Sequence, residues 1–143
     1  MANVIPNAFK GELLSGTHNF ASGGNQFKLA LYTSNPYDTS STAYSTTNEV
    51  SASGGSNYTT TGLVLQNQSV TTGATSFVDF DDLTFSSATF SAAFGAIYND
   101  TNSDKICVVL DFGGTKTATN GDFKIVFPAT GTPANAIISL ANA

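Results

Sequence analysis

Residues 89–112 read TFSAAFGAIYNDTNSDKICVVLDF, and this stretch determines the class of fold that the sequence predicts. Two apolar runs, Thr89–Tyr98 and Lys105–Phe112, have the length and the aromatic and β-branched content of strands. The polar residues Asp100–Asp104 connect them. Parallel neighbours need a crossover of about a dozen residues or more, so strands joined by so short a connection must be antiparallel. The stretch therefore predicts a β-hairpin.

Short apolar runs separated by polar turns continue along most of the chain. The clearest strand is Gln26–Ser34, in which large apolar residues recur at every second position from Phe27. Turns are predicted at Thr71–Gly73, at Gly113-Gly114 and at Asn120-Gly121. The other expected strands are Gly62–Val70, Thr75–Phe80, Leu83–Ser86, Asp122–Phe127 and Ala136–Leu140. Together these runs predict an all-β chain of about eight or nine strands, folded as an antiparallel β-sandwich of jelly-roll or immunoglobulin-like type.

One short helix and one long loop complete the expected organisation. Asn7–Ser15 has the pattern of a helix, with Gly16 placed to stop it. Residues 35–57 lack apolar periodicity and predict a long, exposed, polar loop. We find no internal repeat, so residues 1–143 are interpreted as a single β-domain, with residues 1–16 as an N-terminal arm that contains the helix.

The composition excludes several classes of function. The chain has 143 residues and a net charge of −5, with five Lys and no Arg, so it lacks the cationic surface that nucleic-acid binding needs. No apolar run approaches the roughly 20 residues of a membrane span, and the N-terminus has no secretory signal pattern. The single cysteine, Cys107, cannot form an intramolecular disulfide. We therefore expect no nucleic-acid partner, no membrane association and no export.

Few residues are available for catalysis. His18 is the only histidine, and no Gly-x-Ser-x-Gly motif accompanies it. Asp79 and Asp81 would share one face of a strand, as the carboxylates of a glycosidase or a calcium site can, but turn-forming aspartates explain them as well. Asp100–Asp104 resembles a calcium loop, except that Lys105 stands where glycine is required. We expect no catalytic, cofactor or metal site; a small hydrolase using His18 or the Asp79–Asp81 pair is an alternative.

Two groups of side chains are candidates for binding another molecule. The first is the apolar part of the N-terminal arm, expected to dock onto a larger assembly or a neighbouring subunit: Val4, Ile5, Phe9, Leu13 and Leu14. The second is Tyr37, Tyr44 and Tyr58 around the polar loop, which could recognise sugars or proteins, or could pack the loop itself. Runs that are apolar on both faces, such as Ile106–Leu110, indicate a sheet covered on both sides, by the chain's own loops and helix or by another subunit.

Several segments, taken in order, resemble one protein family. They are ELLSGTHNF at 12–20, FKLALYT at 27–33, TAYSTTNEV at 42–50, FVDF at 77–80, AIYNDT at 96–101, VLDFGG at 109–114 and AII at 136–138. These segments are similar to those of small β-rich virion proteins encoded in tailed bacteriophage and prophage genomes. The likeness extends over most of the chain.

The resemblance implies a non-enzymatic structural protein of the virion, most simply a decoration protein that binds the outer surface of the head and stabilises it. The major capsid protein or another virion protein would be its partner, and a homo-oligomer, with a trimer favoured, its form. It would be assembled onto the particle in the cytoplasm of the bacterial host. The alternative is a tail or head-fibre adhesion module that binds host-surface carbohydrate through the tyrosines of the polar loop.

Overall fold

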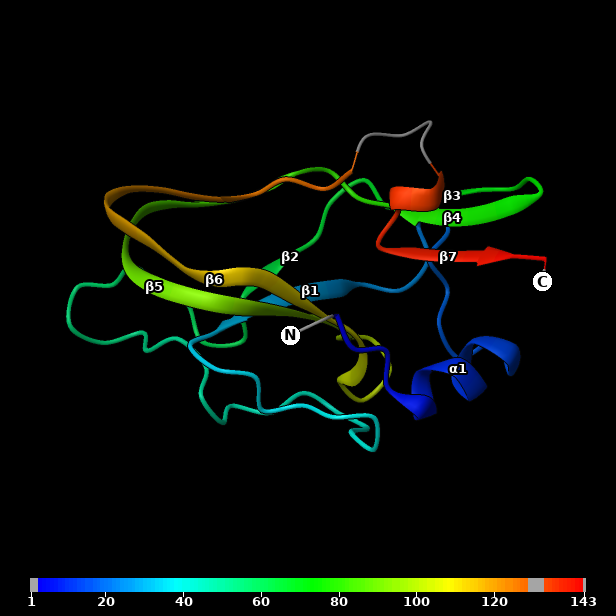
Figure 1. Ribbon diagram of the computed structural model, residues 1–143, viewed down its shortest axis with the longest axis horizontal. Helices are drawn as coiled ribbons and strands as arrows, with labels where there is room; N and C mark the ends of the chain where they lie inside the picture. The colour runs from blue at the N-terminus through cyan, green and yellow to red at the C-terminus, as the bar shows by residue number, and fades with distance from the viewer. Residues whose placement is uncertain (1–2, 129–132, 143) are drawn as a thin grey trace.

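The computed structural model describes residues 3–128 and 133–142 and consists mostly of β-strands (Figure 1). In chain order the elements are α1 (Asn7–Leu14), β1 (Phe27–Tyr32), β2 (Leu63–Val64), β3 (Ser69–Thr71), β4 (Thr75–Asp79), β5 (Leu83–Asn99), β6 (Lys105–Ile125), the 3₁₀ helix η1 (Pro133–Asn135) and β7 (Ile138–Ala141). A mainly β chain with one short N-terminal α-helix is confirmed.

The strands of the described residues form two antiparallel sheets. The larger has the order β2-β1-β5-β6, and the smaller has the order β3-β4-β7. The predicted hairpin between residues 89 and 112 is present as the pairing of β5 with β6, and the turn near Thr71–Gly73 joins the paired strands β3 and β4. Seven strands are present in this part of the chain instead of the expected eight or nine.

The strand number is lower because β5 and β6 each merge two expected strands, whereas the single strand expected over Gly62–Val70 is divided into β2 and β3. The turns predicted at Gly113-Gly114 and Asn120-Gly121 are wrong: both pairs lie inside β6, where the register with β5 shifts. Between the partners Ala92↔Lys116 and Phe94↔Asp111, the four residues 112–115 of β6 lie opposite one residue of β5. Gly113 and Gly114 have φ of 70° and 132°, which glycine adopts at little cost. The bulged hairpin bends back over itself, and both β5 and β6 continue beyond the bend (Figure 1).

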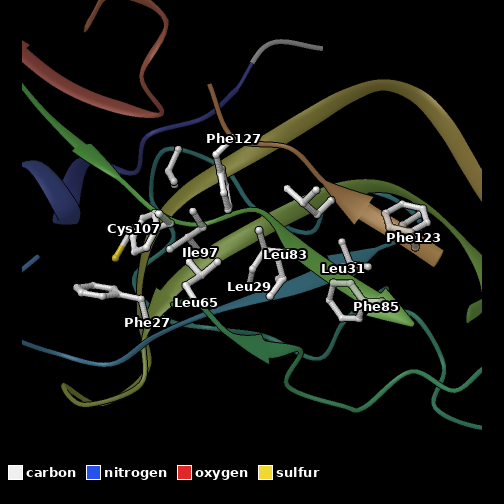
Figure 2. Packing of buried hydrophobic residues seen from close by; sticks show 14 of the residues in the cluster. Phe27, Leu29, Leu31, Leu65, Leu83, Phe85, Ile97, Cys107, Phe123 and Phe127 are labelled. Carbon is white, nitrogen blue, oxygen red and sulfur yellow. The ribbon is translucent and has the colours of Figure 1, made fainter. Parts of the chain in front are cut away.

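The main core lies inside this bend. Figure 2 shows how side chains from β1, β5 and β6 converge there with those of the connecting segments. The labelled members are Phe27, Leu29, Leu31, Leu65, Leu83, Phe85, Ile97, Cys107, Phe123 and Phe127. Phe27, Leu29 and Leu31 of β1 are each 0% exposed, so the period-two pattern of this strand marks a buried face as predicted.

A second apolar cluster lies on the opposite face of the four-stranded sheet. It contains Ala30, Tyr32, Tyr37, Ala96, Tyr98, Ile106 and Val109, with Val4, Tyr44 and Phe94 packed against it. Tyr37 and Tyr44 come from the long loop and Val4 from the N-terminal arm, so the chain itself covers this face. The apolar character of both faces of β5 and β6 is thereby explained without a neighbouring subunit.

The helix α1 ends as its sequence predicts, one residue earlier than expected. Gly16 has a φ of 74°, its N–H donates to the carbonyl of Leu13 at 3.2 Å, and the N–H of Thr17 donates to the carbonyl of Glu12 at 2.9 Å. This pair of bonds is the Schellman arrangement, which satisfies the last carbonyls of a helix. Phe9 is 1% exposed and anchors the helix in the main core.

Gly62 provides a test of how closely the chain packs at the edge of the sheet. Its φ is 76°, and a Cβ atom added there would lie 1.9 Å from the carbonyl oxygen of Leu29 in β1. Gly55 has the same φ but nothing within 4 Å of such an atom. We expect Gly55→Ala to cost about 1–2 kcal/mol of unfolding free energy for the left-handed conformation alone, and Gly62→Ala more than about 4 kcal/mol because backbone must move. Urea unfolding measures both, and equal losses would contradict this packing.

Candidate functional site

His18 lies in a buried polar network that joins α1 to the β5–β6 hairpin. Its Nε2 is 2.8 Å from Oε2 of Glu12, and the other Glu12 oxygen accepts a hydrogen bond from Nζ of Lys105, also at 2.8 Å. The His18 side chain is fully buried. One carboxyl group of the helix therefore binds both the segment that follows the helix and the first residue of β6.

The partners of His18 determine which of its nitrogens carries hydrogen. Oδ1 of Asn99 accepts the backbone N–H groups of Thr101 and Asn102, each at 3.1 Å, so Nδ2 of Asn99 must face His18 Nδ1, at 3.0 Å. Nδ1 is then an acceptor, and Nε2–H donates to Glu12. Both nitrogens are engaged and shielded from solvent, which is the arrangement of a histidine that holds a turn and not of an accessible catalytic base.

The other candidates for catalysis are also engaged in structural contacts. Burial raises the pKa of the Cys107 thiol above its usual value, so the thiolate needed of a nucleophile is disfavoured. The strand β4 ends at Asp79, so Asp81 does not share its face as expected; Asp81 accepts a hydrogen bond from Asn67 at 2.6 Å. Asp100, in the turn between β5 and β6, pairs with Lys28 at 2.9 Å. No cluster of three or more metal-ligating side chains occurs among the described residues.

The Glu12 contacts predict how stability depends on pH. Burial by itself would raise the pKa of this carboxyl, but the hydrogen bonds and positive charge of Lys105, with the hydrogen bond from His18, hold it below its usual value of 4.5. A carboxyl with a depressed pKa in the folded state stabilises the protein above its unfolded-state pKa and loses that contribution as pH falls. We expect Glu12→Gln to lower unfolding free energy by about 1–3 kcal/mol at pH 7, and by less at pH 3.

Urea unfolding of the Glu12→Gln variant at the two pH values measures this difference. Asp122→Asn, which removes an exposed carboxyl, is the matched control and should change little at either pH. An equal loss at pH 7 and pH 3 would contradict the role of the Glu12 charge.

Glu49 organises the long loop. Its Oε1 accepts hydrogen bonds from the Tyr58 hydroxyl at 2.7 Å and from the N–H of Thr61 at 2.8 Å, and its Oε2 accepts the Tyr44 hydroxyl at 2.5 Å. The Tyr58 oxygen also accepts the backbone N–H of Leu31 in β1 at 3.0 Å. The carboxylate thus connects the loop to Tyr58 and Thr61, which follow it in the chain, and through Tyr58 to the sheet.

The tyrosines proposed as a recognition surface are packed inside the loop. Tyr37 and Tyr58 are 6% and 4% exposed, and the hydroxyls of Tyr37 and Tyr32 are 2.7 Å apart. The ring of the half-buried Tyr44 stacks on that of Tyr98 with centroids 4.6 Å apart. Of the two interpretations of Tyr37, Tyr44 and Tyr58, the structure supports loop packing. Most of the long polar loop expected over residues 35–57 is exposed, but Tyr37 and Val50 are buried, and Tyr37 and Tyr44 pack on the sheet.

The tyrosine cluster predicts a cooperative loss of structure in alkali. Burial first, and then hydrogen bonds to Glu49, raise the pKa of Tyr44 and Tyr58 above the usual value of 10, and burial likewise raises that of Tyr32. A group with a raised pKa in the folded state stabilises the protein below its unfolded-state pKa and loses that contribution as pH rises above it. We expect tyrosinate absorbance to appear together with unfolding, above pH 10.

A pH titration followed by absorbance and by far-ultraviolet circular dichroism tests this expectation. The two signals should change in one transition, and the alkaline midpoint should move to lower pH when Gly55→Ala weakens the fold. Ionisation of all the tyrosines near pH 10 in a chain that keeps its circular dichroism would contradict the buried cluster.

The N-terminal arm is attached to its own domain. Val4 and Val109 exchange backbone hydrogen bonds of 3.0 and 2.8 Å, so the arm extends the outer edge of β6. Phe9 is a core residue and Leu13 packs against the core. Only Ile5 and Leu14 of the proposed docking residues are exposed, at 39% and 91%. Of the five residues expected to dock onto a larger assembly, Val4, Phe9 and Leu13 instead pack against the chain's own sheet and core.

An apolar groove of about 340 Å³ lies between the end of α1 and the three-stranded sheet. It is lined by Leu13, His18, Asn19, Phe20, Ala21, Val70, Ser76, Phe77, Val78, Ile138, Ser139 and Leu140, none of which is Asp, Glu or Lys. Val70 and Leu140 are 48% and 63% exposed. The sequence does not reveal this groove, since the alternation of Ile138 and Leu140 indicates a strand but not that the Leu140 side chain stays uncovered.

A second groove, of about 590 Å³, follows the bend of β6 and has a different character. Charged side chains of both signs line it, including Lys116, Asp122 and Lys124. Lys124 is paired with Asp82 at 3.0 Å. The mixed charges of this second groove favour no single class of ligand. The apolar groove is the stronger candidate site because two exposed apolar side chains, Val70 and Leu140, line it, whereas the second groove has Val126 among charged neighbours.

Comparison with known proteins adds no relative: no protein-family model, curated protein or solved structure matches this chain. None of the helices in the described residues has the length and apolar character needed to cross a membrane.

Proposed function

We propose that this protein is a non-enzymatic structural protein of a tailed-bacteriophage virion, a decoration protein that binds the outer surface of the head. The observation that carries the proposal is the uncharged apolar groove with Val70 and Leu140 exposed at it. Such a surface is unfavourable in water and is typical of a site that another protein covers. The succession of segments that resembles small virion proteins indicates which protein that is, the major capsid protein.

The energetics of decoration suit a small surface of this kind. Burying one exposed Val or Leu side chain stabilises a contact by roughly 1.5–3 kcal/mol. A single site of this size binds weakly, but a shell offers many equivalent sites, and each bound copy stabilises the assembled state by mass action. The two antiparallel sheets, as a β-sandwich, would form the rigid body that holds the groove against the shell. A homo-oligomer, most simply a trimer, would engage several capsid subunits together.

The alternative function, carbohydrate adhesion, requires tyrosines that are exposed around the long loop. Tyr37 and Tyr58 are buried and their hydroxyls are bonded within the domain, so they are not available to stack on a sugar. The hydrolase alternative depended on His18 and on the Asp79–Asp81 pair, whose geometry serves the fold. Decoration in the virion, reached by assembly in the bacterial cytoplasm, is the function that we retain.

Quantitative mass spectrometry of purified particles from the bacteriophage that encodes this chain tests the proposal. We expect a copy number comparable to that of the major capsid protein. With Val70→Asp we expect occupancy of the particle to fall at least about tenfold, because a charge would be buried in place of an apolar side chain. Val126→Asp is the matched control, since Val126 is 68% exposed but lines the mixed-charge groove along β6 instead of the apolar groove, and it should leave occupancy unchanged.

The two other possible counts are equally informative. A number that matches only a ring or a few fibres would contradict head decoration and assign the protein to the neck or tail. Absence from particles would overturn the virion assignment itself. Circular dichroism of the free Val70→Asp protein establishes that its loss of binding is not a loss of folding.

A further inference from the structure

Asn120-Gly121 is the one Asn-Gly pair in the sequence, and it lies in a bulge of β6. Between the partners Ala88↔Gly121 and Phe90↔Ala118, two residues of β6 lie opposite Thr89 alone. Asn120 is one of these two, and its φ is 49°. Because a bulge interrupts the regular ladder between two strands, this asparagine is held less firmly than a residue inside the ladder.

An asparagine side chain can react with the peptide nitrogen that follows it. The nitrogen loses its proton and attacks the amide carbon Cγ, so that a C–N bond forms, ammonia leaves, and the side chain closes with the backbone into a succinimide ring. Water then opens the ring at one of its two carbonyl groups. The product is aspartate or isoaspartate, which has one more methylene group in its main chain. Water is the only co-reactant, and asparagine is accordingly one of the heat-labile residues.

Gly121 leaves this attack unobstructed. A side chain on the following residue crowds the approach of its nitrogen to Cγ, and glycine has none. A Cβ atom added at Gly121 would have one neighbour within 4 Å beyond the adjacent residues, the carbonyl oxygen of Thr119 at 3.7 Å. Asn120 is exposed, so water has access to the ring once it has formed.

Thr89 places a hydroxyl group at the amide that would react. The N–H of Asn120 donates to Oγ1 of Thr89 at 3.0 Å, and the Thr89 hydroxyl donates to Oδ1 of Asn120 at 3.3 Å. Attack on Cγ brings negative charge to Oδ1 in the transition state, and a donor already aimed at that oxygen stabilises the charge. The N–H of Thr89 donates to the carbonyl of Ser56 at 3.0 Å, which helps to fix the residue that carries the donor.

Three other exposed asparagines allow a comparison, because their backbone has the same left-handed conformation. Asn48, Asn57 and Asn67 have φ of 60°, 56° and 51°. The residues that follow them are Glu, Tyr and Gln, whose side chains crowd the attacking nitrogen. The amide nitrogens of the latter two also donate hydrogen bonds, to a backbone carbonyl and to a carboxylate. Asn120 differs in its glycine neighbour and in the hydroxyl donor at its amide oxygen.

We propose that Asn120 is a site of spontaneous deamidation, at which the Gly121 nitrogen is the nucleophile and the Thr89 hydroxyl stabilises the transition state. The product carries a new carboxylate two residues from Asp122, on a chain whose net charge is −5. Asp122 lines the mixed-charge groove, so this face of β6 becomes more negative as the protein ages. The reaction needs only water and is independent of the virion assignment.

The test is incubation of the full chain in mildly alkaline buffer, followed by trypsin digestion and mass spectrometry. Cleavage after Lys116 and Lys124 gives the peptide 117–124, TATNGDFK, in which Asn120 is the one side-chain amide. We expect this peptide to gain the mass difference between an acid and an amide before any asparagine of the peptide 29–105 does. Two chromatographic products, aspartate and isoaspartate, identify the succinimide route.

Two pairs of proteins separate the contributions of glycine and hydroxyl. Gly121 does not have a left-handed φ and has room for a Cβ atom, so Gly121→Ala should fold normally and convert at least about tenfold more slowly. Thr89→Val should convert several-fold more slowly, whereas Thr89→Ser, which keeps the hydroxyl, should convert as the wild type does. Circular dichroism of each variant establishes that its fold is retained.

Three results would overturn the proposal. If the folded chain keeps Asn120 intact while the isolated peptide TATNGDFK converts, the bulge protects the asparagine. Equal rates in the wild type and Gly121→Ala would exclude attack by the Gly121 nitrogen as the limiting chemistry. A rate in Thr89→Val equal to or above that of the wild type would exclude stabilisation by the Thr89 hydroxyl.

Discussion

The four-stranded sheet buries apolar side chains on both of its faces, and the rest of the chain is arranged to cover it twice. One face packs into the bend of the β5–β6 hairpin, together with Phe9 of α1. The opposite face is covered by the N-terminal arm and by residues of the long loop. A sheet with two apolar faces cannot remain exposed on either, since burial of apolar surface is the main favourable contribution to folding.

When a loop covers a sheet, its polar groups enter an apolar environment and need hydrogen-bond partners. Glu49 provides these partners. The loop makes few regular backbone hydrogen bonds, and its tyrosines bring hydroxyl groups into an apolar environment, where an unpaired hydroxyl is costly. The Glu49 carboxylate accepts two of these hydroxyls and the N–H of Thr61, while Tyr58 also receives the N–H of Leu31. Glu12 has the same role beneath α1, where it joins His18 to Lys105.

The segments that cover the larger sheet explain where the exposed apolar surface lies. The arm and the loop are used on the larger sheet, and α1 is held to the hairpin by Glu12. Among the residues that the structure describes, none covers the end of β7 in this way, and the groove and the exposed Leu140 remain there. In a chain with few charged residues, the proposed docking surface is thus a part of the sheet surface that the described segments of the chain leave uncovered.

The sequence by itself determined the local structure. The alternation of Phe27, Leu29 and Leu31 predicts β1, the short polar connection predicts an antiparallel hairpin, and Gly16 predicts the end of α1, because each depends on residues close together in the chain. Tertiary structure decided the rest. A glycine pair allows a turn or a bulge, and only pairing with β5 makes Gly113-Gly114 a bulge.

At the candidate site, too, the local sequence predicts the residue types, and tertiary contacts decide which side chains are exposed. Tyr37 and Tyr58 have the residue type of a binding surface, and they are buried because residues distant in sequence, Leu31 and Glu49, provide their partners. Leu140 has the pattern of a core strand, and it stays exposed because no described segment packs over it. Which apolar side chains are covered depends on contacts between distant parts of the chain, which a local pattern does not contain.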